Sequence, residues 1–317
     1  MSKTFLLFLA TCALVLAQRP SDPKLLIPQE APLFDLKWVA NPLTLPEGLN
    51  FGLPGSVTFD SKGHLWVLNR GPQPVSEFDE NGKFIRAFGD GLFGNRPHAL
   101  RLDPEGNIWV ADGSTHIVVK LDQQGKVLLT LGTKGQAGKW DEAAGTRLLN
   151  QPNEVAFGRN GDVFLVQGHT PGAMGDPRVF KFDKTGKLIK QWGGKGTEPG
   201  KFDVAHSINI DSKGQLWVTD REHQRIQIFD QDGNYIKELK FMGLPCSIDI
   251  GKDFIIMVNG FTGQILKLDL DGKVLSATPK MMDGLGEFGE AHHVAVSAKG
   301  EIFVADVTKG VQKFVAR

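Results

Sequence analysis

Cysteine and tyrosine are scarce in this sequence, and its charges balance. The 317 residues include two cysteines and one tyrosine, with 36 basic and 36 acidic side chains. Two cysteines allow one disulfide at most, which excludes a disulfide-stapled scaffold. Phosphate backbones need clustered Lys and Arg, so the balanced charge argues against a nucleic-acid partner. At 41% apolar and 23% charged residues, the composition is that of a globular chain.

One apolar run, residues 5–17, opens the chain after a basic residue. Such a run ending in small residues is typical of a secretory signal peptide, so we expect residues 1–17 to be removed before Gln18. The run is shorter than the roughly 20 residues of a transmembrane helix, so we expect no membrane span after removal. An uncleaved anchor and a lipoprotein site at Cys12 are the alternatives. The mature chain, periplasmic or secreted, would keep Cys246 alone and form no internal disulfide.

One sequence motif occurs six times after Gly52. Each copy pairs two apolar alternating runs across a glycine turn, and two further runs follow around Asp-Gly, Thr-Gly or Asn-Gly turns, which are hairpin signals. Four short antiparallel strands per repeat of about 40 to 55 residues predict an all-β six-bladed β-propeller. The copies open near residues 54, 96, 151, 204, 244 and 290.

The last copy ends at Arg317 after three strands. We expect residues 36–39 to supply the missing strand and close the ring. Residues 36–317 then form the propeller, and the proline-containing residues 18–35 wrap its outside. A ring closed by its own strand needs no partner chain, so we expect a monomer.

Histidine recurs at one position of alternate copies. In a six-bladed ring these equivalent positions lie 120° apart at the start of the innermost strand, so three imidazoles should converge on the axis. Three His with an open fourth position are a catalytic zinc arrangement, and channel-lining polar residues are the alternative. Cys246 on the same ring is either a fourth ligand or a small buried thiol. The six positions are Gly55, His98, Asn153, His206, Cys246 and His292.

A second ring of Asn, Asp and Gln follows the next run in each copy and is expected to hold tight turns. Arg70 and Arg221 break its glycine pattern. An arginine near the channel mouth can clamp a carboxylate in a bidentate pair, and a salt bridge between blades is the other interpretation of each. This pattern favours a small-molecule or peptide substrate that carries a carboxylate.

The segments RPHALRLDPEGNIWVAD, GKFDVAHSINI with TDREHQRIQIF, and AHHVAVS resemble NHL-type repeats. More specifically, the chain resembles the peptidyl-α-hydroxyglycine α-amidating lyases over nearly the whole ring. Those enzymes cleave the C–N bond of a carbinolamide to an amide and glyoxylate, without a redox cofactor. The resemblance implies that the zinc histidines are His98, His206 and His292, and that the substrate-site arginines are Arg70 and Arg221.

The chain departs from that family at several positions. The catalytic tyrosine of the family is His169 here, which would act as a base, as an additional ligand, or as a surface residue; Tyr235 is expected in an outer strand. A methionine before the third zinc histidine is Glu290. A carboxylate associated with structural calcium is His293, so the resemblance does not support calcium. These changes suggest related chemistry on a different substrate.

Three functions follow from these patterns. The first is a zinc-dependent lyase acting on an α-hydroxyglycine amide or a related carbinol compound. The second is a non-catalytic scaffold that binds a peptide, glycan or protein, because fold alone does not choose a function. The third is a calcium-dependent lactonase-like hydrolase, which we rank last because calcium prefers oxygen ligands and this ring offers imidazoles.

Overall fold

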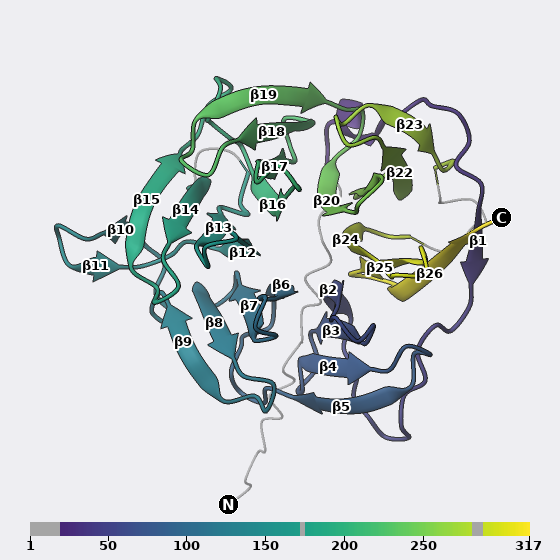
Figure 1. The fold of residues 1–317 in the computed structure, drawn as a ribbon, viewed down its shortest axis with the longest axis horizontal. Coiled ribbons are helices and arrows are strands. Elements are labelled where there is room, and N and C mark those ends of the chain that lie inside the picture. The colour runs from purple at the N-terminus through teal and green to yellow at the C-terminus, as the bar shows by residue number, and fades with distance from the viewer. Residues whose placement is uncertain (1–19, 172–174, 281–287) are drawn as a thin grey trace, which may run out of the picture.

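Six four-stranded antiparallel sheets are arranged as blades around a central axis (Figure 1). The computed structural model describes residues 20–171, 175–280 and 288–317, and the expected signal peptide and Cys12 lie outside these ranges. Within them there are 26 strands and no α-helix. The six-bladed propeller predicted from the repeats is thereby confirmed.

The innermost strand of each blade lies against the axis and contacts the innermost strands of the two neighbouring blades. These six strands begin buried and become half-buried toward their ends. They are therefore the elements that bring distant parts of the sequence together. They are β2 (Pro54–Phe59), β6 (Pro97–Leu102), β12 (Pro152–Phe157), β16 (Ala205–Ile210), β20 (Pro245–Ile250) and β24 (Ala291–Val296).

The second strand of each blade is buried along its whole length, because neighbouring blades cover both of its faces. Its last residue is Asn, Asp or Gln, and in three blades it holds the following turn: Asn69, Asp112 and Asp306 accept from the amide two residues further on (2.8, 2.9 and 2.8 Å). The structural role predicted for this polar ring is thus confirmed in those three blades. The strands are β3 (Leu65–Asn69), β7 (Ile108–Asp112), β13 (Val163–Gln167), β17 (Leu216–Asp220), β21 (Ile255–Asn259) and β25 (Ile302–Asp306).

The third strands lie between the second strands and the outer ones. The turn that follows each of them in the first five blades carries a glycine at positive φ, such as Gly125 at 84°, where a side chain would strain the backbone. The third strands are β4 (Val75–Phe78), β8 (Ile117–Leu121), β14 (Arg178–Phe182), β18 (Arg225–Phe229), β22 (Gln264–Leu268) and β26 (Gly310–Ala316).

The outer strands form the rim of the ring, and Tyr235 begins one of them, as predicted. Five follow their own blade along the chain, whereas the sixth comes from the N-terminal part. They are β5 (Phe84–Phe88), β9 (Val127–Leu131), β15 (Leu188–Gly193), β19 (Tyr235–Lys240), β23 (Val274–Ala277) and β1 (Leu36–Val39).

The ring closes where β1 pairs antiparallel with β26, as the sequence predicted. The indole of Trp38 donates to the side-chain oxygen of Gln312 across this pair (2.8 Å). Upstream, the 3-10 helix η1 (Pro23–Leu26) precedes a segment that runs along the fifth blade, where the amide of Phe34 donates to the carbonyl of Ala277 (2.8 Å). Both ends of the described chain are therefore tied to the ring.

Apolar side chains fill the spaces between neighbouring blades. There are six buried clusters among the described residues, and each combines side chains of two adjacent blades. Trp109 packs with Leu165 in one, and Trp217 packs with Met257 in another. Burial of one such side chain contributes about 1.5–3 kcal/mol. Contacts between blades, rather than within them, thus fix the ring and the axis.

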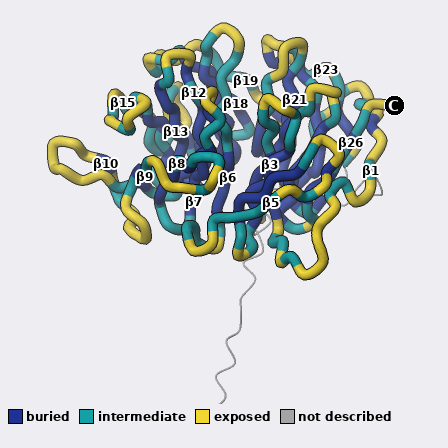
Figure 2. Tube along the Cα trace, turned by 60° about the horizontal axis from the view of Figure 1, so that its bottom comes forward, coloured by how far each residue is buried: buried dark blue, intermediate teal, exposed yellow. Residues whose placement is uncertain are grey.

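A short hairpin of β10 (Trp140–Asp141) and β11 (Thr146–Arg147) is inserted between the second and third blades. It projects from the ring and is largely exposed (Figure 2). Trp140 anchors it against the ring of Phe182, with 4.9 Å between the centroids. Among the described residues, no helix has the length and apolar character that crossing a membrane requires.

Candidate metal centre

The three predicted histidines occupy one position in alternate blades. His98, His206 and His292 are each the second residue of an innermost strand, on β6, β16 and β24. At this position all six innermost strands contain a register shift against the second strand. The residue there pairs with no partner in the ladder, and such bulges re-aim a side chain. The bulge therefore turns each imidazole toward the axis.

Each of these imidazoles is held by the blade that follows it. The Nδ1 of His98 donates to the carbonyl of Asn153 (2.9 Å), that of His206 to Cys246 (2.8 Å), and that of His292 to Gly55 (2.7 Å). A carbonyl can only accept, so the ring proton must lie on Nδ1. Each Nε2 is left with a lone pair, which is the tautomer of a metal ligand fixed by an outer hydrogen bond.

The three Nε2 atoms converge without a proton between them. The Nε2 atoms of His98 and His292 are 3.2 Å apart, and Nε2 of His206 is buried without a hydrogen-bond partner among the described residues. Lone pairs that face one another at this distance repel unless a cation lies between them. The residues present therefore fit a metal ion, and three imidazoles suit zinc.

Electrostatics keep these side chains neutral. Burial and the neighbouring imidazoles lower the pKa of His98 well below its ordinary value, and burial and Arg221 do the same for His206. Burial and the charge of Arg70 lower the pKa of His292 to about 3. Neutral imidazole is the form that binds a metal.

His169 joins this cluster from the loop that follows β13. Its ring centroid lies 5.0 Å from that of His98 and 5.3 Å from that of His206. The donor atoms of all four histidines lie within 4.8 Å of one another. His169 thus lies beside the other three imidazoles, and the surface interpretation of it is wrong.

Cys246 is fully buried, and burial raises the pKa of its thiol to about 12. Among the described residues it is not part of the group of gathered metal-binding atoms. Of its two interpretations, the buried thiol fits this structure.

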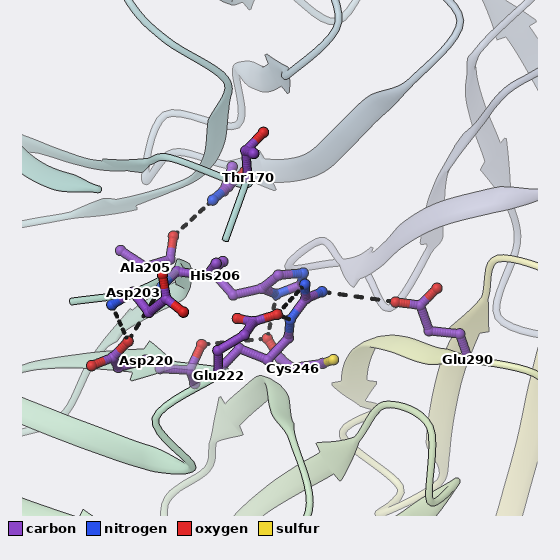
Figure 3. A network of polar contacts seen from close by, with 12 residues as sticks. Thr170, Asp203, Ala205, His206, Asp220, Glu222, Cys246 and Glu290 are labelled. Atoms are coloured by element: carbon purple, nitrogen blue, oxygen red, sulfur yellow. Dashed lines mark hydrogen bonds and ion pairs between the residues drawn. The ribbon is translucent and has the colours of Figure 1, made fainter. Parts of the chain in front are cut away.

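The two predicted arginines differ in their surroundings. Arg221 donates from Nε and Nη2 to Glu222 (2.9 and 2.6 Å), and its Nη1 lies 3.8 Å from Glu290. Burial alone would lower its pKa, but Glu222 raises the pKa above the ordinary value. Arg70 makes no such pair with any residue in the described ranges, and burial lowers its pKa. Glu222, Glu290, Cys246 and His206 lie in one polar network (Figure 3).

A third arginine escaped the sequence analysis. Arg96 directly precedes β6, two residues from His98, and its charge contributes to lowering the pKa of His98 and His169. Nothing in the repeat pattern marks it, because the other copies carry Gln, Val, Leu or Glu two residues ahead of the ring position. Its proximity to His98 was the available signal.

His293 points away from the metal centre into a buried ion network. Its Nε2 lies 2.9 Å from Glu154, which also pairs with Arg101 (2.5 Å). Burial would raise the pKa of Glu154, but Arg101 and His293 hold it at about 2. The guanidinium of Arg101 supplies the positive charge beside this carboxylate, so the position offers no support for calcium.

A second group of potential ligands lies on the first blade. Nδ1 of His64 is 2.8 Å from Glu77 and 3.9 Å from Asp60. Arg86 already pairs with Glu77 (2.6 Å). This group is therefore accounted for as an ion-pair network.

Comparison with known proteins supports the repeat assignment. The model of the NHL repeat matches residues 202–229, which contain β16, β17 and β18. NHL repeat-containing protein 3 of Homo sapiens is 34% identical over 102 residues, covering 32% of this chain and 28% of that protein. The probable peptidyl-alpha-hydroxyglycine alpha-amidating lyase of Caenorhabditis elegans is 31% identical over 194 residues, covering 57% of this chain and 52% of that protein. The chain thus spans between about a quarter and a half of these relatives.

Solved structures show the same fold at low sequence identity. A streptogramin B lyase superposes with a TM-score of 0.59 at 15% identity, covering 89% of this chain and 97% of that one. A gluconolactonase from Xanthomonas campestris gives 0.60 at 14% identity, covering 84% and 87%. The chain carries an NHL repeat in a six-bladed propeller and resembles the amidating lyases.

Proposed function

We propose that this chain is a zinc-dependent lyase that cleaves the C–N bond of an α-hydroxyglycine-type carbinolamide, or of a related small carbinol compound, to an amide and glyoxylate. One observation carries the proposal: three imidazoles from alternate blades are locked as Nδ1–H tautomers with their free Nε2 atoms facing one another. The similarity to amidating lyases supplies the reaction class.

His98, His206 and His292 would hold the ion, and when bound, zinc supplies Lewis-acid chemistry that makes a neighbouring hydroxyl more acidic. His169 stands beside this position, where one of its ring nitrogens would accept the hydroxyl proton. An electron pair of the deprotonated hydroxyl oxygen then forms the C=O bond of glyoxylate as the C–N bond breaks; the C–N electron pair stays on nitrogen, and the proton is returned to that nitrogen to give the amide. Arginines around the cluster hold the carboxylate of the substrate, and no redox partner is required.

The experiment measures metal content and turnover in the same preparations. The wild-type protein should hold about one zinc per chain and release glyoxylate from an N-acyl-α-hydroxyglycine, and a chelator should stop the release. The triple variant His98→Ala, His206→Ala, His292→Ala should remain folded and lose the zinc. His64→Ala is the matched control, because it removes a histidine from the second group of ligands and should keep both properties.

His169→Ala separates a base from a ligand. If His169 is the base, the variant should keep its zinc and release glyoxylate at least about a hundredfold more slowly, which is a typical contribution of acid–base catalysis. Loss of zinc would instead assign His169 to the ligand set.

A non-catalytic scaffold is the second candidate, favoured by the similarity to NHL repeat-containing protein 3. It requires that the triple histidine variant still bind a peptide, glycan or protein ligand of the wild type. A protein that holds zinc but turns over no carbinol compound would favour this candidate.

The remaining parts of the proposal concern the setting of the enzyme. We propose an exported monomer that acts on a small molecule or peptide bearing a carboxylate, with no nucleic-acid partner. The lyase relatives and the neutral formal charge support this setting. Cell fractionation and sedimentation analysis test location and oligomeric state.

A further inference from the structure

Arg221 is already neutralised by the protein. It is 6% exposed, and Glu222 accepts two of its N–H bonds while Glu290 lies on its other side. Both carboxylates are themselves largely buried. Two internal carboxylates thus occupy the guanidinium, and a substrate carboxylate would have to displace one of them into a site with little water. Such exchange of one charged pair for another gains little free energy.

Arg70 has the opposite character. Its Nε is buried and has no hydrogen-bond partner among the described residues. No carboxylate of those residues lies within ion-pair distance of it, although the charge of Glu290 influences its pKa. A buried N–H without an acceptor is costly. An anionic ligand would remove that cost.

Arg96 is the second unpaired guanidinium at the cluster. No hydrogen bond or ion pair of its side chain occurs within the described ranges, and its charge acts on Arg70 as well as on His98. Asp112, whose charge acts on Arg96, accepts from Gly94 (2.6 Å) and from the side chains at positions 114 and 115. Those bonds hold the oxygens of Asp112 away from Arg96. Two guanidiniums that influence each other's charge, both without a carboxylate partner among the described residues, can share one anion.

We propose that Arg70 and Arg96, not Arg221, bind the carboxylate of the substrate, and that Arg221 is a positioning residue held by Glu222 and Glu290. This inference rests on the proposed lyase function for the identity of the anion, a small α-oxygenated carboxylate. It departs from the assignment that the family resemblance implies, because that assignment pairs Arg70 with Arg221. Glu290, which stands where that family has a methionine, adds a second carboxylate beside Arg221.

The test measures binding of glyoxylate to the zinc-loaded protein by calorimetry, independently of turnover. Arg70→Gln and Arg96→Gln should each raise the Kd about tenfold or more, the loss typical of a hydrogen bond between charged groups. Neither variant breaks an internal ion pair, so both should fold. Arg221→Gln should change the Kd by less than about threefold. It should lower the melting temperature, because it leaves the carboxylates of Glu222 and Glu290 buried without their cation. If it does not fold, Arg221→Lys replaces it. Arg147→Gln on the exposed hairpin is the matched control.

The outcomes separate this inference from the function on which it rests. Binding that is lost in Arg221→Gln but retained in Arg70→Gln and Arg96→Gln would overturn the inference, and so would a wild type that binds no glyoxylate. If the wild type turns over a carbinolamide but Arg70→Gln and Arg96→Gln bind glyoxylate as tightly as the wild type does, the proposed function would stand and the anion site would be refuted. Binding that depends on Arg70 and Arg96 without any turnover would support the anion site and reject the reaction.

Discussion

Replacing His206 by alanine should remove most of the metal-dependent stabilisation of this fold. His206 is the cluster member whose Nε2 is buried without a partner, and its Nδ1 is fixed by the carbonyl of Cys246. The three histidines come from blades two, four and six, so a shared ion links parts of the ring that are distant in sequence. Loss of one ligand therefore weakens a cross-link of the whole propeller.

The size of the effect follows from binding linkage. A metal present at a thousand times its Kd stabilises the native state by about 4.1 kcal/mol. Loss of an outer hydrogen bond to a ligand already costs up to about 100-fold in affinity, so loss of the ligand itself should cost at least that, or about 2.7 kcal/mol. At about 2 °C per kcal/mol for a large domain, the metal-dependent rise in melting temperature should fall from about 8 °C to about 3 °C.

The assay is a pair of thermal melts for each protein, one with zinc and one with a chelator. Taking the difference within each protein cancels the effect of the substitution on the metal-free fold. The control variant His64→Ala removes a histidine from the second group of ligands. Its zinc-dependent rise in melting temperature should equal that of the wild type. An undiminished zinc-dependent shift in His206→Ala, or a shift lost in His64→Ala instead, would refute the reasoning.

Three further predictions concern the buried ion pair of Glu154, the closure of the ring by residues 36–39, and the titration of His223. Glu154→Gln should lower the free energy of unfolding by about 3–5 kcal/mol in urea titration, because it leaves Arg101 buried without its carboxylate; a change within about 0.5 kcal/mol would contradict this. Deleting residues 36–39 should expose the edge of β26 and produce concentration-dependent oligomers in sedimentation, whereas a stable monomer would show that closure is dispensable. His223 donates to Asp220 (2.8 Å), which raises its pKa above the ordinary value of about 6.5, so its NMR titration midpoint should lie higher. Its contribution to stability should be present below pH 6.5 and lost as the pH rises through the folded-state pKa, and a midpoint at or below 6.5 would exclude this.

The repeat pattern predicted most of the fold because each blade is a local unit. Alternating apolar runs and glycine turns define four strands within one copy, and these need no knowledge of the rest of the chain. Closure by residues 36–39 was predictable from the strand missing after Arg317, since an unpaired edge is disfavoured. The insertion of the hairpin at Trp140 had no repeat signal and was not predicted.

The metal centre was predictable in part. Equivalence of positions alone places His98, His206 and His292 around one axis. The resemblance to a family placed His169, but the repeats did not. Arg96 was missed because no other copy carries an arginine at the equivalent position, and only its charge acting on the cluster gives it a role.

By itself, the sequence determined the strands, the six-fold repetition and the three equivalent histidines, because each copy of the repeat defines its own strands and the copies can be aligned position by position. The tertiary structure alone decided which nitrogen of each imidazole faces the axis, because the carbonyl that fixes it belongs to the next blade. It also decided that Glu290 approaches Arg221 from the sixth blade, while the Nε of Arg70 has no hydrogen-bond partner among the described residues. Charge pairing across an axis depends on distances through space, and no spacing along the chain encodes them.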